Sequence, residues 1–292
     1  MRFGLVGTGH WATTVHAPGL AAADGVELVG VWGRDLARAE AIAAPHGAGG
    51  YDDVDLLLAD VDALAFAVPP PVQAEIALRA VRAGKHLLLE KPVAMDLAVV
   101  DELVAEVVER DLATIVFFTS RFVAPWEAWL EETSSAGMLG GRADWMSSHK
   151  GKDNPYAASA WRREHGALWD VGPHMLSQLI PVLGPVVDVS GVRGAEDLVH
   201  LVLTHEGGAT SRMSLTQSMP TSAVRVGLEF YGEAGWRVQP DVERDVDAAY
   251  ATAVGDLVAM ITSGTRGHRC DVHFGREIVD VIARCEAALS PR

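Results

Sequence analysis

Apolar positions in the first 120 residues fall into two kinds of stretch that alternate along the chain. Short apolar runs that predict buried strands lie at 2–7, 26–32, 62–68, 85–90 and 113–118. Stretches of helical period lie between them, near 11–22, 36–47, 72–84 and 96–111. Strands that alternate with helices imply right-handed crossovers, so the pattern predicts an α/β domain with a parallel, doubly wound sheet.

The pattern changes after about residue 120, where strands follow one another with short turns. Predicted strands lie at 139–149, 186–193, 197–206, 209–218 and 223–231, and the Gly-Gly pair within 205–210 indicates a hairpin. Predicted helices lie at 123–136, 170–183, 247–263 and 275–289. We therefore expect domains at 1–119 and 120–292. The second is an α+β domain with an open, mostly antiparallel sheet, and its last helix is able to pack back on the first domain.

A glycine-rich loop follows the first predicted strand and opens a helix. Its residues are Gly7, Thr8, Gly9, His10, Trp11 and Ala12, in the order GxGxxA. The first glycine permits a tight turn, the second lets the backbone approach a pyrophosphate, and the small third residue allows close packing of helix on strand. The loop predicts a dinucleotide site, and a glycine turn without a ligand is the alternative.

Composition narrows the choice of partner and compartment. The net charge of −15 argues against nucleic acid or an anionic membrane, because both require a basic face. Cys270 and Cys285 are expected to be reduced thiols rather than a disulfide scaffold. No leader or long apolar run is expected, so the cytoplasm is the expected location, and no His or Cys spacing predicts a metal.

Three motifs together resemble one enzyme family. They are the GxGxxA loop, AGKHLLLEKP at 83–92 and WDVGPHMLSQL at 169–179. The chain resembles the glucose–fructose oxidoreductase/inositol dehydrogenase/rhizopine catabolism (GFO/IDH/MocA) family over nearly its whole length. The resemblance implies a Rossmann domain followed by a domain whose open sheet often forms the subunit contact. It also implies hydride transfer between NAD(P) and a sugar, a polyol or a related diol.

Two charged residues, Glu90 and Lys91, follow the buried run Leu87–Leu89. In a parallel sheet, ligands lie beyond the carboxyl ends of the strands. By resemblance, Lys91 points at the reacting hydroxyl or carbonyl beside the nicotinamide, where an ammonium stabilises an alkoxide. A surface ion pair between Glu90 and Lys91 is the alternative, and we expect a cis bond before Pro92. By the same resemblance, Pro69, Gln73, Glu90 and Lys91 are expected around the cofactor.

Asp170 and His174 are four residues apart at the predicted start of a helix, which puts both side chains on one helix face. Pro173 is compatible with the first turn of such a helix. By resemblance, His174 exchanges the hydroxyl proton of the substrate, and Asp170 orients the substrate or the imidazole. A helix N-cap for Asp170 and a buried structural histidine for His174 are the alternatives.

The chain departs from the family pattern at two positions that usually face cofactor or substrate. Many relatives carry histidine where this chain has Gln73, and aspartate where it has Ser177, so the substrate does not follow from the resemblance. Weaker candidates for substrate contact are Arg121, His149, Lys150, Trp161, Arg162 and Ser177. His16, His46, His86 and His200 are taken as structural.

The end of the second predicted strand bears on the choice between NAD and NADP. An acidic residue there binds the ribose of NAD, but this chain has Gly33 followed by Arg34. Glycine leaves room for a 2′-phosphate and arginine pairs with it, so NADP is expected to be preferred over NAD. Asp35 is expected to cap the next helix, and the alternative is that it bends back to the ribose.

Strands with two usable faces, such as 209–218 and 223–231, predict a sheet with one uncovered face. A homodimer, or a dimer of dimers, is the expected assembly. The leading interpretation is a sugar or polyol oxidoreductase. A non-catalytic dinucleotide-binding regulator on the same fold and a reductase of a non-sugar ring remain alternatives. Substrate identity and reaction direction stay open.

Overall fold

The computed structural model describes residues 1–148 and 159–289. The chain forms two compact units, one of Met1–Phe122 with Asp245–Glu277 and one of Val123–Arg244 with Ile278–Arg292. The sequence analysis set the boundary between 119 and 120 and allowed the last helix to pack back on the first domain, whereas here residues 245–277 belong to the first unit. The difference arises because residues 245–277 bury their apolar side chains on the first unit, a long-range contact that sequence order does not reveal.

The first unit is built on a six-stranded parallel sheet in the order β3-β2-β1-β4-β5-β6, which confirms the predicted doubly wound fold. Its strands are β1 (Arg2–Val6), β2 (Glu27–Trp32), β3 (Gly49–Tyr51), β4 (Ala63–Phe66), β5 (His86–Leu89) and β6 (Thr114–Val116). Its helices are η1 (Ala12–His16), α1 (Ala17–Ala22), α2 (Leu36–Ala43), η2 (Ala44–His46), α3 (Val54–Asp60), α4 (Pro70–Arg82), α5 (Leu97–Glu109), η3 (Thr119–Phe122) and α8 (Val246–Ser263). Strand β3 and helix α3 were not predicted, because both are short and carry little periodicity.

Helix starts in this unit follow the sequence signals closely. Asp35, Asp53, Asp96 and Asp245 each accept a backbone N–H with the side chain at the first turn of α2, α3, α5 and α8. Helix α4 begins instead with prolines, which fit a first turn because their missing N–H is not needed there. Of these caps only Asp35 was predicted, and α3 was missed although Asp53 caps it.

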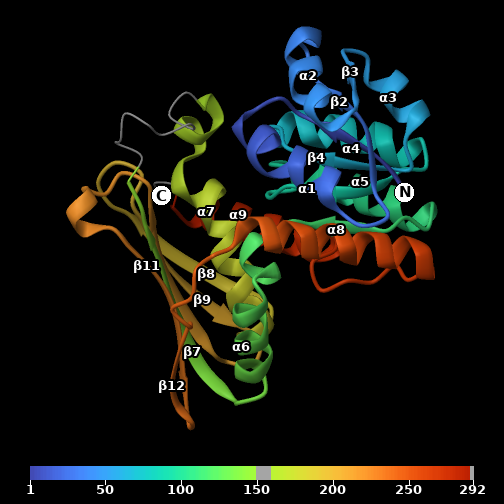
Figure 1. Ribbon diagram of the computed structural model, residues 1–292. Helices are drawn as coiled ribbons and strands as arrows, with labels where there is room; N and C mark the ends of the chain where they lie inside the picture. The colour runs from blue at the N-terminus through green and yellow to red at the C-terminus, as the bar shows by residue number, and fades with distance from the viewer. Residues whose placement is uncertain (149–158, 290–292) are drawn as a thin grey trace. The chain divides into compact units, whose positions relative to one another are not determined.

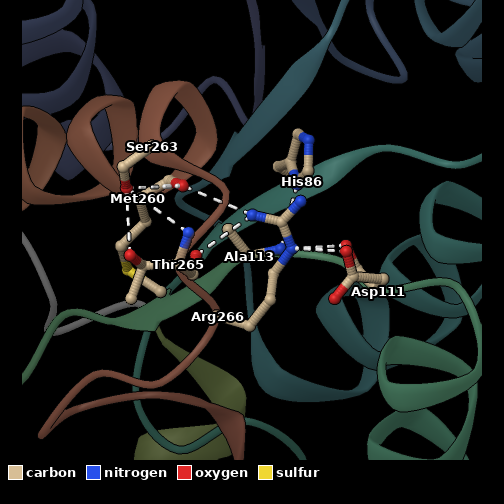
Figure 2. A network of polar contacts seen from close by, with 7 residues as sticks. All are labelled: His86, Asp111, Ala113, Met260, Ser263, Thr265 and Arg266. Atoms are coloured by element: carbon tan, nitrogen blue, oxygen red, sulfur yellow. Dashed lines mark hydrogen bonds and ion pairs between the residues drawn. The ribbon is translucent and has the colours of Figure 1, made fainter.

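The segment after α8 is fixed to the first unit by a polar network around Arg266 (Figure 2). The Arg266 guanidinium donates to the carbonyl oxygens of Asp111 at 2.6 Å and Thr265 at 3.1 Å, and pairs with the Asp111 carboxylate at 3.2 Å. Nearby, the imidazole Nδ1 of His86 accepts the backbone N–H of Ala113 at 2.9 Å. The Arg266 contacts with Asp111 hold the chain after α8 against the C-terminal end of α5.

The second unit contains a six-stranded mixed sheet in the order β12-β11-β7-β10-β9-β8 (Figure 1). Its strands are β7 (Met138–Met146), β8 (Val186–Arg193), β9 (Val199–His205), β10 (Thr210–Thr216), β11 (Arg225–Gly232) and β12 (Gly235–Val238). Its other elements are α6 (Ala124–Ser134), α7 (Ala160–Leu183), η4 (Thr221–Ala223) and the later part of α9 (Val272–Leu289). All pairs are antiparallel except β7 with β10, so the predicted open, mostly antiparallel sheet is confirmed.

Helix α7 consists of two helical stretches that meet at Gly166, and the second begins directly after this residue, close to the predicted position 170. Two expectations about this start are nevertheless corrected. Gly166, at φ 64°, interrupts the helical backbone, and the helix continues beyond it. Asp170 therefore lies within the helix and is not its N-cap, and Pro173 lies in the interior rather than in the first turn. A positive φ costs glycine little, and at Gly166 it divides the two helical stretches.

One face of the second sheet is covered by a helix, and the other face is exposed. Helix α7 packs on β7, β9 and β10 (Figure 1). Leu201, Met213 and Leu215 of β9 and β10 are buried. On the other face Val192, Val202, Trp236 and Val238 are exposed. Among the described residues, no helix is both long and apolar enough to span a membrane.

Candidate active site

The glycine loop has the geometry that a pyrophosphate requires. Gly7 has φ 134°, and a Cβ at this position would collide with the carbonyl oxygen of Ala67. Its N–H donates to the Trp32 carbonyl at 2.9 Å, which continues the parallel β1–β2 pairing into the start of the loop. At Gly9 a Cβ would meet no atom within 4 Å, so the backbone is open to an approaching group. Ala12 is fully buried, as the small third residue of the motif should be.

This loop lies at the point where the strand order of the sheet reverses. Strand β1 is in the centre, with β2 on one side and β4 on the other. The connections after β1 and β4 leave the sheet at the same carboxyl edge, where α/β proteins bind their ligands. Pro69, the exposed residue before α4, and Lys91, which follows β5, belong to that edge.

At the end of β2, the structure adds a steric detail to the Gly33–Arg34 pair. A Cβ at Gly33 would lie 2.5 Å from Cγ2 of Thr8, so the glycine loop itself leaves no room for a side chain there. Arg34 is exposed beside it. Asp35 uses its carboxylate to accept the N–H of Arg38 at 3.2 Å, so the predicted N-cap is confirmed.

The turn after β5 contains the expected cis bond between Lys91 and Pro92. The Glu90 carboxylate accepts the indole N–H of Trp11 at 2.7 Å and lies 3.1 Å from Nε2 of His16. His16 was taken as structural, and its fully buried ring is indeed part of the support of this turn. Burial and the nearby Glu90 charge raise the pKa of the buried Tyr250 hydroxyl well above its usual value.

Gln73 also lies against this turn. Its side-chain nitrogen donates to the carbonyl oxygens of Glu90, Pro92 and Val93 at 2.7, 3.2 and 3.0 Å. Its side-chain oxygen accepts the N–H of Glu90 at 2.9 Å. The sequence interpretation expected Gln73 to face the cofactor, whereas the structure places its carboxamide on the backbone that carries Lys91.

In the second unit, α7 presents Asp170 and His174 one turn apart, and both are largely buried. The Asp170 carboxylate accepts Nε of Arg162 at 2.9 Å and the amide of Gln217 at 2.7 Å. The His174 ring stacks on the indole of Trp145, with centroids 5.4 Å apart and planes at 16°. A carboxylate and an imidazole held in this way can orient a hydroxyl and exchange its proton.

Sequence reasoning missed Gln217 and Trp145. Gln217 directly follows strand β10 and Trp145 lies in strand β7, so both are outside α7 in the sequence. Only the folded sheet brings them to this helix. Gln217 is fixed in turn by Asp197, which accepts the backbone N–H of Gln217 at 2.9 Å. Neither residue belongs to a motif, so the sequence carried no signal for them.

The weaker candidates have different surroundings. The Arg162 guanidinium lies 5.0 Å from the ring of Trp161, and the Ser177 hydroxyl donates to the His174 carbonyl at 2.9 Å. Arg121 is buried in the first unit, with its guanidinium 5.9 Å from the Phe274 ring. His149 and Lys150 lie outside the described residues. Within the described ranges, no group of three or more His, Cys, Asp or Glu side chains could hold a metal ion.

The first unit is a parallel sheet with a glycine-rich loop at the point where its strand order reverses, and the second unit has a mixed sheet. Nucleotide-dependent oxidoreductases have this architecture. Residues 1–118 match the oxidoreductase family with an NAD-binding Rossmann fold, GFO/IDH/MocA, and residues 131–238 match a C-terminal domain of the same family. The chain belongs to this family, so the resemblance noted from its motifs is confirmed.

Three known proteins illustrate the relationship. An uncharacterized oxidoreductase of Synechocystis sp. is 31% identical over 260 residues, covering 79% of this chain and 69% of that protein. A protein from gentamicin A biosynthesis, solved in complex with NAD, superposes with a TM-score of 0.86 at 19% identity, over 99% of this chain and 93% of that one. A 3-ketoreductase from Actinomadura kijaniata, solved with TDP-benzene and NADP, has a TM-score of 0.80 at 20% identity, over 99% and 98%.

Proposed function

We propose that this oxidoreductase transfers a hydride between a nicotinamide cofactor and the CH–OH carbon of a sugar, a polyol or a related diol. The observation that carries the proposal is the turn after β5, which presents Lys91 at the carboxyl edge of the parallel sheet. The glycine loop lies at the same edge. When bound, the nicotinamide supplies the acceptor or donor of hydride. Gly7 and Gly9 provide the cradle that its pyrophosphate needs.

Lys91 is assigned to the oxygen of the reacting carbon. Its ammonium stabilises negative charge that develops on that oxygen during oxidation and polarises the carbonyl during reduction. His174 is assigned to the proton of the same hydroxyl, which it accepts in oxidation and returns in reduction. Asp170, held by Arg162 and Gln217, orients the substrate or the imidazole.

The test is a turnover screen followed by two variants. Sugars, inositols, diols and nucleotide-linked sugars are assayed with both nicotinamide cofactors, the last group because a neighbour of this fold binds a TDP derivative. With an active substrate, Lys91→Ala should lower turnover about 100- to 1,000-fold, and His174→Ala about 100- to 10,000-fold. Both variants should bind the nucleotide normally.

The competing function is a regulator that binds a dinucleotide without catalysis. It predicts nucleotide binding with no turnover of any compound in the screen. Near-normal turnover by folded Lys91→Ala would instead show that the enzyme works without this ammonium. Lys85→Ala is the matched control, because Lys85 donates to the Val61 carbonyl at 2.9 Å on the opposite edge of the sheet.

We further propose that NADP is preferred over NAD. The support is the exposed Arg34 beside Gly33, together with the engagement of Asp35 in capping α2. Arg34→Ala should weaken NADPH binding about 10- to 100-fold, the range of a charge-assisted hydrogen bond, and leave NADH binding unchanged. Fluorescence titration measures both. Tighter binding of NADH than NADPH by the unmodified protein would refute the preference.

The converse experiment places an acidic residue at position 33 in order to shift the preference towards NAD. Gly33→Asp alone would clash with Cγ2 of Thr8, so a loss of binding in that variant would have two causes. Combining it with Thr8→Ser removes that methyl group and leaves room for the carboxylate. The double variant should shift the preference towards NADH, and Thr8→Ser alone should not.

For assembly we propose a homodimer, or a dimer of such dimers, formed through the open face of the second sheet. On this face apolar Val202 and Val238 flank Arg142, which bonds the Asp144 carboxylate at 3.0 Å. Charges of both signs between apolar edges suit a two-fold contact. In sedimentation at micromolar concentration, Val202→Glu should yield monomers, while Leu56→Glu, at an exposed apolar site on the first unit, should not. A monomeric unmodified protein would contradict the proposal.

A further inference from the structure

The turn that carries Lys91 leaves the sheet with its backbone polar groups buried. Strand β5 ends at Leu89, and Pro92 and Val93 are buried immediately beyond it. Carbonyl oxygens in such a place need hydrogen-bond donors, because a buried backbone group without a partner is strongly unfavourable. Neighbouring strands do not supply them once the chain has turned, so side chains must.

Gln73 supplies them from helix α4. Its NH₂ group lies within 3.2 Å of the carbonyl oxygens of Glu90, Pro92 and Val93, and its oxygen accepts the Glu90 N–H. An NH₂ group has two hydrogens, so at least one is shared among the three acceptors. The orientation of the carboxamide is fixed, because carbonyls only accept and the N–H only donates. With 1% of its surface exposed, Gln73 is a buried clamp on this turn.

The Glu90 side chain fixes the same turn from another direction. One of its oxygens accepts from Trp11 and contacts His16, and the other accepts the N–H of Lys91 at 3.2 Å. Residues five apart on an α-helix point about 140° apart. The π-helical segment Ala12–His16 widens the turn, which lets Trp11 and His16 meet one carboxylate. The backbone of Lys91 is thus held on both sides.

We propose that Gln73 is a positioning residue for Lys91. It sets the backbone from which the Lys91 side chain reaches the reacting oxygen, and it touches neither substrate nor cofactor. The kinetic part rests on the proposed function of Lys91, but the structural part does not. A displacement of about 1 Å at a reacting group can lower turnover about 100-fold, so a clamp with four hydrogen bonds has a large effect available to it.

The environment of the Lys91 side chain can be measured by NMR without a substrate. The chain contains four lysines, Lys85, Lys91, Lys150 and Lys152. Reductive methylation with ¹³C-formaldehyde gives each a resolvable NMR signal, and Lys91→Arg assigns the one from Lys91. Lys85 is an internal control, because it is held by Val61 rather than by Gln73.

Two variants remove the clamp in different ways. Gln73→Leu keeps the size and loses all the hydrogen bonds. Gln73→Glu keeps an acceptor for the Glu90 N–H but sets a carboxylate against three carbonyl oxygens. Val81→Ala, a cavity in the buried face of the same helix, controls for general loss of stability. We expect the Lys91 signal to shift and narrow in both Gln73 variants, and the Lys85 signal to stay unchanged in all three.

Kinetics complete the test. With an active substrate, both Gln73 variants should lower kcat about 100-fold while the Kd for NADPH changes less than twofold, and Val81→Ala should leave kcat unchanged. An unmoved Lys91 signal in folded Gln73→Leu or Gln73→Glu would overturn the proposal. So would a large loss of NADPH affinity, which would make Gln73 a cofactor contact. If Lys91→Ala itself is fully active, the proposed function fails, and the NMR result still decides whether Gln73 positions the turn.

Discussion

Tyr250 offers a prediction in which removing a polar atom stabilises the protein. The side chain lies on α8, fully buried, with its ring 4.5 Å from that of His16 and 5.2 Å from that of Phe117. In the part of the chain that the structure describes, its hydroxyl has no hydrogen-bond partner. Its pKa is raised well above the ordinary value, so the hydroxyl is neutral at any working pH.

The magnitude follows from these contacts. A buried hydroxyl without a partner costs about 1–3 kcal/mol, and Tyr250→Phe removes it while keeping the ring contacts. We therefore expect the free energy of unfolding to rise by about 1 kcal/mol, which for a chain of this size raises Tm by about 2 °C. Tyr250→Ala, which also removes the ring, should instead lose about 3–5 kcal/mol.

Tyr51→Phe is the matched control, because the Tyr51 hydroxyl donates to Asp60 at 3.0 Å. That variant should lose about 0.5–1.5 kcal/mol, the usual contribution of a hydrogen bond. Thermal unfolding and urea titration of the three variants measure the differences. A lower Tm for Tyr250→Phe than for the unmodified protein would refute the reasoning, since it would mean that the hydroxyl makes a favourable bond.

Three further predictions concern pH, the glycine loop and His174. Burial, and then the Arg266 charge, lower the pKa of His86 below 6.5. The contribution of neutral His86 to the free energy of unfolding is therefore fully present above pH 6.5. It falls by up to about 1.4 kcal/mol per pH unit as the pH drops below that value. His86→Gln should flatten that part of a urea-midpoint profile, and an NMR titration of His86 at or above 6.5 would contradict this. Gly7→Ala should lower both Tm and NADPH affinity, whereas Gly9→Ala, in open space, should lower affinity alone; unchanged NADPH binding by Gly9→Ala would count against a pyrophosphate there. Trp145→Leu should lower kcat by up to about tenfold, since stacked aromatic pairs contribute about 0.5–1.5 kcal/mol, and Trp145→Phe should retain most activity; equal rates for the two would remove stacking as the cause.

The sequence by itself determined the architecture of the first unit. Short apolar runs between turn signals, such as Leu87–Leu89, predicted buried strands, and these leucines are fully buried in the sheet. Asp35 marked the start of α2, and Gly7 marked a turn that no other residue fits. These signals are local, because each depends on the chain within a few residues, and so they can be read without the fold.

Other features depend on residues that are distant in sequence, and only the tertiary structure decided them. Gln73 was expected near the cofactor, but its carboxamide binds the backbone of 90–93, which lies 17 to 20 residues away. Gln217 and Trp145 reach α7 from separate strands, and residues 245–277 rejoin the first unit across more than a hundred residues. A hydrogen bond or a packed ring is decided by distance in space, which periodicity and motif spacing along one chain do not contain.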